Sequence, residues 1–443
     1  MDNSKYKYQE IAATISAAIE SGEYPVGSKL PAHRVLAKEL QTTAVTVAKA
    51  YQYLVEQRQV ESFVGRGSYV LPERLKNVIN AEPLSNAINF SILQPCMSLS
   101  INTLNRQISQ QFQSLSNARL FAYSENSGLV AHRISGARWC QNFGLAVPDP
   151  EQIILTNGAQ NALASLIQLY SKEGDYIALE AQTYPGLLAI CKHLRRKVLP
   201  IKMDGQGMLP EDLTTQCLAH KPSMVVIVPS QQNPTGATMG SARRESIATV
   251  IKVQKIWLIE DDIYAFLNNQ PLSPISNLIP ERAFYISSLS KAISPGLRCG
   301  YIKCPVEQHS VLADFIRATL WLASPFMFEI ASELINSKQA FMLAQAQCDM
   351  AKTRQVLVTQ YLAQVTEVCI DRQPFSYSCW LHLPDHLSAK KFTEMAQEKS
   401  VIVSDASHFS TQKSINAVRL SIMSPASEAE LVEGLKIIAQ LLT

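Results

Sequence analysis

The stretch Ser288-Leu289-Ser290-Lys291, followed closely by Pro295-Gly296-Leu297-Arg298, decides the fold of this chain. It comes shortly after the apolar run at residues 283–286, which is typical of a buried strand. A single lysine after a strand is usually a solvated surface residue. The meaning of Lys291 therefore depends on the segments that surround it in the sequence.

Strand-like and helical patterns alternate on the N-terminal side of this stretch. The expected strands cover residues 153–156, 176–180, 197–201, 224–229, 257–260 and 283–286, and the expected helices include 159–170 and 243–253. Such alternation predicts parallel strands with helical crossovers, in a sheet that is buried on both faces. Beyond residue 321, helical segments alternate with apolar runs at 380–383 and 417–420, which predicts a smaller α+β domain.

Polar segments lie where several predicted strands end. They are Glu260-Asp261-Asp262-Ile263-Tyr264, Asn233-Pro234-Thr235-Gly236, Thr156-Asn157-Gly158-Ala159-Gln160 and Thr183-Tyr184-Pro185-Gly186. Taken singly, an acidic pair at a strand end is usually a cap or a solvated turn, and Asn-Pro with Gly is a common turn. Ligands of open α/β sheets, however, collect at the carboxyl ends of the strands, and a helix N-terminus at residues 156–160 would direct free amides at an anion.

Together these segments, in this order, resemble the fold-type I aminotransferases over residues 90 to 443 or so. The resemblance implies that Lys291 forms an imine with pyridoxal 5'-phosphate and that Asp261 pairs with the pyridine nitrogen, which keeps the ring an electron sink. It also implies that Tyr264 and Asn233 reach the ring oxygen.

The resemblance assigns the other candidate site residues by the group that each would meet. The phosphate would be bound by Ser288, Arg298 and the strand-to-helix junction at Gly158, Ala159 and Gln160. Tyr184 would stack on the cofactor ring, and Tyr123 would contact the phosphate bound by the neighbouring subunit. Arg419 would bind the carboxylate of a substrate or effector. The alternative is that Tyr184 is an ordinary core or surface tyrosine.

The first 72 residues carry a different pattern. Ile11, Ile15, Ala18 and Ile19 share one helical face, a short helix is expected at 31–40, and Thr43 is suited to cap a helix in which Val47, Tyr51 and Leu54 recur at i, i+4 and i+7. Two short helices joined in this way resemble a helix-turn-helix. The runs at 60–63 and 68–71 flank Gly65-Arg66-Gly67, which predicts a hairpin with a basic tip, or wing.

These features resemble the GntR type of winged helix, over residues 4 to 72. The resemblance implies contacts with double-stranded DNA by Arg34, Thr43, Thr46 and Lys49, and by Arg66 at the wing. A basic residue that is usual near the start of the recognition helix is Ala44 here, which puts base preference at that position in doubt. A small helical domain that serves only protein contacts is the alternative.

Composition narrows the class of protein. The net charge of +3 is too small to indicate nucleic-acid binding by itself, so the DNA interpretation rests on the motif. The apolar runs have the length of strands, and the first residues lack a secretory signal. Nine scattered cysteines without a CxxC pair suit a reducing compartment. We therefore expect a cytoplasmic protein with no membrane span, no disulfide and no metal site.

A GntR-type domain fused to a fold-type I domain is similar to the MocR regulators. We expect an α/β protein with a winged helix-turn-helix at 1–72, a linker at 73–92 and a domain that binds pyridoxal phosphate at 93–443. The large mixed, mainly parallel sheet of that domain is expected in residues 125–320 or so, and a small α+β part at about 321–443. The resemblance implies a homodimeric transcription regulator that senses an amino compound or the cofactor itself.

Two other functions stay open at this stage. The chain could be an active aminotransferase that carries a DNA-binding domain, or a dimerisation scaffold without cofactor. Where the resembling enzymes often have glycines, this chain has Pro374-Phe375-Ser376-Tyr377-Ser378-Cys379-Trp380 and Ser404-Asp405-Ala406-Ser407. Because bulkier residues there would reshape the substrate side, we expect weak or vestigial transamination.

Overall fold

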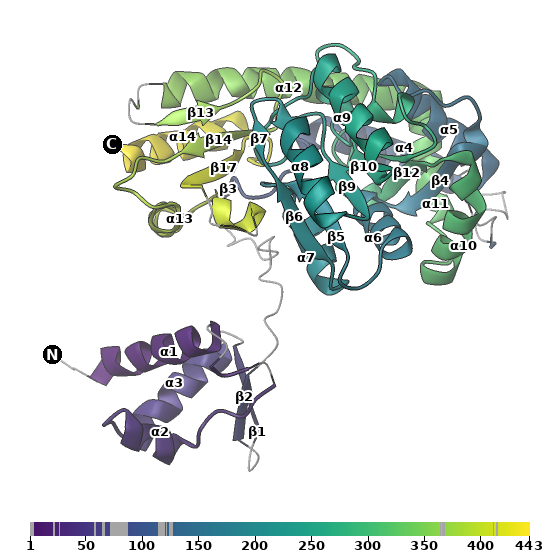
Figure 1. The fold of residues 1–443 in the computed structure, drawn as a ribbon. Coiled ribbons are helices and arrows are strands. Elements are labelled where there is room, and N and C mark those ends of the chain that lie inside the picture. The colour runs from purple at the N-terminus through teal and green to yellow at the C-terminus, as the bar shows by residue number, and fades with distance from the viewer. Residues whose placement is uncertain are drawn as a thin grey trace. The chain divides into compact units, whose positions relative to one another are not determined.

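The computed structural model describes residues 4–20, 23–25, 27–56, 59–63, 67–70, 87–113, 120, 122–123, 127–363, 365, 368–410, 412 and 415–443. The chain divides into two compact units, residues 1–81 and 82–443 (Figure 1). The helices in the described part of the chain lack the length and hydrophobicity of a membrane-spanning segment.

The first unit consists of three helices and a hairpin. Its elements are α1 (Ser4–Glu20), α2 (His33–Glu39), α3 (Ala44–Glu56), β1 (Val60–Phe63) and β2 (Gly67–Val70). The strands are antiparallel, with Val60 opposite Val70. The predicted cap of α3 is confirmed, because the backbone N–H of Thr46 donates to Oγ1 of Thr43 at 3.2 Å. Apolar side chains from all three helices and both strands form one core: Ile11, Ile15, Leu36, Val47, Leu54, Val60 and Val70.

A seven-stranded sheet forms the centre of the second unit (Figure 1). Its order is β4 (Ile153–Asn157), β12 (Cys299–Lys303), β11 (Ala283–Ser288), β10 (Trp257–Asp261), β9 (Met224–Ile227), β5 (Tyr176–Glu180) and β6 (Lys197–Ile201). β12 is antiparallel to both of its neighbours, and the other pairs are parallel. The expectation of a large mixed, mainly parallel sheet is therefore confirmed.

Helices cover both faces of this sheet, as the near-continuous apolar strands require. Because strand side chains alternate, Met224 and Val226 of β9 pack on one face, while Val225 and Ile227 pack on the other. The first face carries α6 (Ala159–Tyr170), α7 (Pro185–His193) and α10 (His309–Thr319). The second carries α8 (Pro210–His220) and α9 (Ser241–Gln254), followed by α5 (Val130–Asn142) and α11 (Pro325–Asn336) beside β12.

The C-terminal part of this unit has its own antiparallel sheet. The strand order is β13 (Cys369–Asp371), β14 (Ser378–His382), β17 (Ala417–Ser421) and β16 (Ser404–Asp405). The helices α12 (Gln339–Leu362), α13 (Ala389–Glu398) and α14 (Glu428–Leu442) belong to this part, and α12 runs along one side of the unit in Figure 1. This unit also contains α4 (Ile101–Gln113) and a short hairpin of β7 (Met203–Asp204) and β8 (Gly207–Met208).

Two strands of this unit differ from the expectations. β3 (Ile88–Asn89) lies within the range assigned to the linker, but it pairs in parallel with β15 (Val401–Ile402) and is followed by the buried Phe90. A strand of two residues is too short to show an alternation of apolar and polar side chains, and its partner lies more than 300 residues away in the sequence. β12 was not predicted either, although it joins β4 to the rest of the sheet.

Candidate functional site

The polar segments identified in the sequence come together at one edge of the seven-stranded sheet. β10 ends at Asp261 and β11 ends at Ser288, while Asn233 follows β9 and Gly158 follows β4. β12 runs in the opposite direction, so its first residue rather than its last lies at this edge, and Arg298 directly precedes it. The topology therefore collects side chains from five separate stretches of the chain.

Lys291 lies in the turn after β11. Its Nζ donates to the backbone oxygen of Leu93 at 2.5 Å, and its own backbone oxygen accepts from the hydroxyl of Tyr377 at 2.8 Å. Burial lowers the pKa of Lys291 to about 8, and the positive charges of Arg419 and Arg298 act in the same direction. A lower pKa increases the share of neutral amine, which is the nucleophilic form.

Asp261 is buried at the end of β10. Its Oδ1 has no hydrogen-bond partner in the described part of the chain. Burial raises the pKa of Asp261 to about 7, with a further contribution from Asp262. A buried carboxyl oxygen without a donor is costly, so this atom is suited to accept a hydrogen bond from a ligand.

A tight approach between two segments shapes the space beside α6. Gly158 precedes this helix with φ +79°, and a Cβ at Gly158 would lie 2.4 Å from Nη2 of Arg298. That nitrogen donates to the backbone oxygen of Asn157 at 3.0 Å. The arrangement leaves the amides at the start of α6 and the exposed guanidinium of Arg298 close together, as an anion site requires.

Two of the predicted phosphate contacts form hydrogen bonds within the protein itself. The Ser288 hydroxyl donates to Oγ of Ser290 at 2.9 Å and accepts from its backbone N–H at 3.1 Å. Gln160 donates through Nε2 to the backbone oxygen of Gly186 at 3.1 Å, and Ala159 begins α6. Tyr184 directly precedes α7, and burial raises the pKa of its hydroxyl, as does the nearby Asp261.

Arg419, in the middle of β17, is a buried cation. It donates through Nη1 to Oδ1 of Asn233 at 2.7 Å and through Nη2 to the backbone oxygen of Ser91, and its guanidinium lies 4.9 Å from the centre of the Phe409 ring. Burial lowers its pKa to about 10. Among the described residues no carboxylate pairs with Arg419, which leaves its charge for an anionic ligand.

Two predicted tyrosines lie in different surroundings. Tyr264 is buried, and burial raises the pKa of its hydroxyl. Its ring meets that of Tyr377 edge to face, with ring centres 6.4 Å apart. Tyr123 is 78% exposed and its ring meets Trp321, with centres 5.5 Å apart. Its predicted role requires a second subunit and is not tested by a single chain.

Several residues near Lys291, Asn233 and Arg419 were missed by the sequence analysis as site residues. Leu93, Ser91 and Tyr377 contact Lys291 or Arg419 as described above, and Ser404 accepts from Nη2 of Arg419 at 3.4 Å. Two of them lie in the bulky segments that replace glycines of the resembling enzymes. That departure was therefore the signal available in the sequence.

Glu180, the last residue of β5, supports the loop that carries Asn233. Its Oε2 accepts from the backbone N–H of Val228 at 3.2 Å and from Nε2 of Gln232 at 3.1 Å. Oε1 of Gln232 in turn accepts from the backbone N–H and the hydroxyl of Thr235 at 3.1 and 2.8 Å. Burial raises the pKa of Glu180 to about 8.

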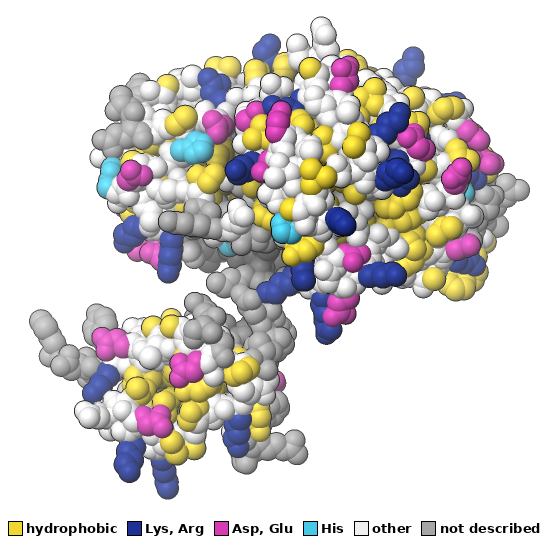
Figure 2. Space-filling model, viewed as in Figure 1, with side chains coloured by type: hydrophobic (Ala, Val, Ile, Leu, Met, Phe, Trp, Pro, Cys, Tyr) yellow, Lys and Arg dark blue, Asp and Glu magenta, His cyan; other side chains and the backbone are white. Residues whose placement is uncertain are grey.

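The predicted DNA-contacting residues lie on the first unit. Arg34 of α2, Thr43 before α3 and Lys49 of α3 are exposed, and Thr46 is half-buried. Figure 2 shows lysine and arginine side chains at the end of this unit where α2 lies in Figure 1. Arg66, the predicted wing contact, lies outside the described residues.

Comparisons with known proteins match both units. Residues 85–435 match the family described as aminotransferase class I and II, and residues 7–70 match the bacterial regulatory proteins of the gntR family. The HTH-type transcriptional regulator YdeF of Bacillus subtilis is 28% identical over 98% of this chain and 94% of its own length. The pyridoxine biosynthesis transcriptional regulator PdxR of Corynebacterium glutamicum is 26% identical over 69% of this chain and 67% of its own.

Solved structures show the same fold for the second unit. The kynurenine aminotransferase of Pyrococcus horikoshii, in complex with PMP, has a TM-score of 0.75 and 22% identity, and the match covers 81% of this chain and 91% of that one. The α-aminoadipate aminotransferase LysN of Thermus thermophilus, complexed with N-(5'-phosphopyridoxyl)-L-leucine, has a TM-score of 0.75 and 21% identity, over 82% and 95%.

We expect Glu180→Gln to flatten the pH dependence of stability. The folded pKa of Glu180 lies near 8, above its ordinary 4.5, so the folded chain keeps a proton that the unfolded chain releases between these values. Stability of the wild type then falls as pH rises through this window, by up to about 1.4 kcal/mol per pH unit, and the fall ends above pH 8 or so. Glutamine cannot ionise, so the variant lacks this component.

Urea unfolding at several pH values measures this difference. Glu173→Gln, at an exposed position, is the matched control and should follow the wild-type curve. Parallel curves for Glu180→Gln and the wild type would contradict the buried, protonated state of Glu180.

Proposed function

Because this chain belongs to the aminotransferase class I and II family and also carries a gntR-type helix-turn-helix domain, we propose that it is a transcription regulator that binds pyridoxal 5'-phosphate and DNA. The observation that carries the cofactor proposal is Oδ1 of Asp261, a buried oxygen without a partner in the described chain. A protonated pyridine nitrogen is the donor that suits it.

The remaining residues fit the other groups of this cofactor. Lys291 would hold it covalently, Arg298 and the amides at Gly158 would bind its phosphate, and Tyr184 would lie against its ring. Tyr264 and Asn233 would meet the ring oxygen. When bound, pyridoxal phosphate supplies an electron-withdrawing ring that stabilises negative charge on an attached amino compound.

The side chains around this position have separate tasks. Asp261 keeps a proton at the pyridine nitrogen, and its raised pKa falls when it gains that partner. Lys291 supplies the neutral amine. Arg419 binds a carboxylate, since its buried charge has no acidic partner among the described residues. The effector that fits this arrangement is an amino compound with a carboxylate, and the cofactor itself is the second possibility.

Regulation requires that the effector distinguish two arrangements of the DNA-binding domains. By linkage, an effector changes DNA affinity only if it binds one arrangement more tightly than the other. A homodimer would supply two DNA-binding domains for paired half-sites, and the exposed Tyr123 would reach the neighbouring subunit's phosphate. We propose this dimer as the regulatory unit.

An active aminotransferase is the second candidate function, because Lys291, Asp261 and Arg419 are all present near one another. The crowding beside them argues for slow turnover. The Tyr377 ring is buried next to Lys291, and Ser404 occupies the side of Arg419.

We expect Lys291→Ala to abolish the visible absorption that appears when pyridoxal phosphate is added to the wild type. The reason is the loss of the amine that holds the cofactor. Basal DNA binding, measured by fluorescence anisotropy, should persist because the first unit has its own core. Lys252→Ala, at an exposed position of α9, is the control that keeps the absorption. A visible band that survives in Lys291→Ala would overturn the assignment, and loss of the fold would make the lysine structural.

We expect Lys49→Ala to weaken DNA binding by a similar factor on all sequences. If Lys49 neutralises one phosphate, the plot of log affinity against log salt concentration becomes shallower by about one. The measurement is a salt titration with the promoter region nearest the coding sequence, and Lys7→Ala on α1 is the control. An unchanged salt slope would exclude a phosphate contact by Lys49.

We expect wild-type protein saturated with the cofactor to transfer amino groups far more slowly than about 1 per second, the lower range of ordinary enzymes. The measurement is steady-state production of the keto acid from a panel of amino acids. Turnover at or above that rate would favour the enzyme over the regulator.

A further inference from the structure

The start of α3 is the part of the first unit that is suited to contact DNA bases. α3 is the second helix of the helix-turn-helix, after α2 and the connecting residues 40–43. In this motif the first residues of the second helix lie in the major groove and contact the edges of the bases. The side chains that α3 exposes in its first turn therefore determine which bases it can distinguish.

α3 has a buried face and an exposed face. The buried face consists of Val47, Ala50, Tyr51 and Leu54, which belong to the core of the first unit. Val45, Lys49 and Gln52 are exposed, and their spacing of i, i+4 and i+7 puts them together on the opposite face. This exposed face is the one that can enter a groove of DNA.

Val45 is exposed although its side chain is apolar. Its exposed fraction is 67%, and in the described part of the first unit the other exposed large apolar residue is Val35 of α2, at 52%. Contact of the two Val45 methyl groups with an apolar group of a ligand is favourable, because it removes apolar surface from water. The first turn of α3 thus offers an apolar contact.

The neighbouring side chains of this turn are less available to a ligand. Oγ1 of Thr43 accepts from the backbone N–H of Thr46 at 3.2 Å, and the two hydroxyl oxygens lie 2.8 Å apart and share a hydrogen bond. Ala44 is half-buried and has a single methyl group as its side chain. Val45 is therefore the exposed side chain of this turn that takes no part in the helix cap.

The chemistry of the major groove selects one base for Val45. Guanine, cytosine and adenine present hydrogen-bond donors and acceptors there, whereas thymine also presents its 5-methyl group. Lys49 lies one turn farther along the same face, and its ammonium group is suited to a backbone phosphate. An apolar contact next to a cationic contact matches a thymine beside a phosphate.

We propose that Val45 contacts the 5-methyl group of a thymine, so that this base is part of the DNA sequence that the protein recognises. The inference rests on the proposed function, since it requires that the first unit bind DNA. It names the base that Val45 distinguishes and the group on that base.

The experiment removes this methyl group and nothing else. Full-length protein first selects its preferred duplexes from a library of random sequence. Each thymine of a selected half-site is then replaced, one at a time, by uracil, which keeps every hydrogen-bonding group of thymine. Fluorescence anisotropy should show one position at which uracil weakens binding about fourfold, the effect expected for one methyl group that leaves an apolar contact.

Two valine variants link this effect to one side chain. Val45→Ala should reduce the difference between the thymine and uracil duplexes to less than about twofold, because the methyl groups that meet thymine are gone. The helix should persist, since alanine is a strong helix former. Val35→Ala, which removes the same groups from the exposed valine of α2, is the matched control and should keep the fourfold difference.

The outcomes separate this inference from the proposed function. Tight binding of a selected duplex without sensitivity to uracil at any position would refute the thymine contact and leave DNA binding in place. A sensitivity that stays fourfold in Val45→Ala would also refute it, because another residue would then contact the methyl group. Failure to bind any duplex would overturn the proposed function and the inference together.

Discussion

The buried carboxyl group of Asp261 is the constraint on which the larger unit depends. A carboxyl at the end of a buried strand, with one oxygen unsatisfied, costs free energy that folding alone does not return. Two cations lie nearby: Arg419 is buried and pairs with no carboxylate in the described part of the chain, and burial lowers the pKa of Lys291. Buried titratable groups with shifted pKa values, gathered at one edge of a sheet, are typical of functional sites, which supports the proposed cofactor site.

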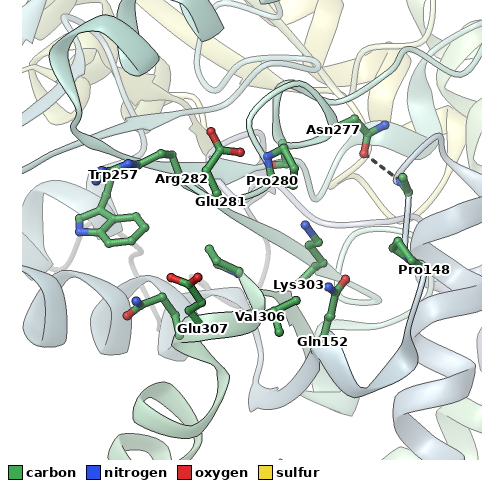
Figure 3. Close-up of a pocket in the computed structure, with 14 residues that line it drawn as sticks. Pro148, Gln152, Trp257, Asn277, Pro280, Glu281, Arg282, Lys303, Val306 and Glu307 are labelled. Carbon is green, nitrogen blue, oxygen red and sulfur yellow. Dashed lines mark hydrogen bonds between the residues drawn. The ribbon is translucent and has the colours of Figure 1, made fainter.

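The antiparallel strand β12 determines what lies at both edges of this sheet. Its N-terminal neighbour Arg298 lies beside Gly158, at the start of α6, whereas Lys303, at the far end, lines a cavity of about 790 Å³ at the opposite edge of the sheet (Figure 3). β10 and β11 run opposite to β12. Asp261 and Ser288, at their C-terminal ends, therefore lie at the edge with Arg298, and Trp257, where β10 begins, lies near the edge with Lys303. β10 therefore has a residue at each edge, and β12 joins Arg298 at one edge to Lys303 at the other.

Much of the fold and part of the site could be predicted from the sequence, because those signals are local. The helix at 159–170 and the strands at 176–180 and 197–201 have the predicted bounds, and the segments around Asp261 and Gly158 lie at strand ends as expected. The missed features depend on contacts that are distant in the sequence. Arg419 meets Asn233 across 186 positions, and Lys291 meets Leu93 across 198. Lys303 belongs to the strand β12 that was not predicted, and only the packed sheet shows that it is buried.

The length of β12 is therefore fixed from two directions. Its five residues pair one to one with β4, from Cys299 opposite Asn157 to Lys303 opposite Ile153. An insertion or deletion of one residue inside this strand would reverse the facing of every side chain beyond it and displace either Arg298 or Lys303. A length of five residues in β12 therefore keeps Arg298 and Lys303 at opposite edges of the sheet.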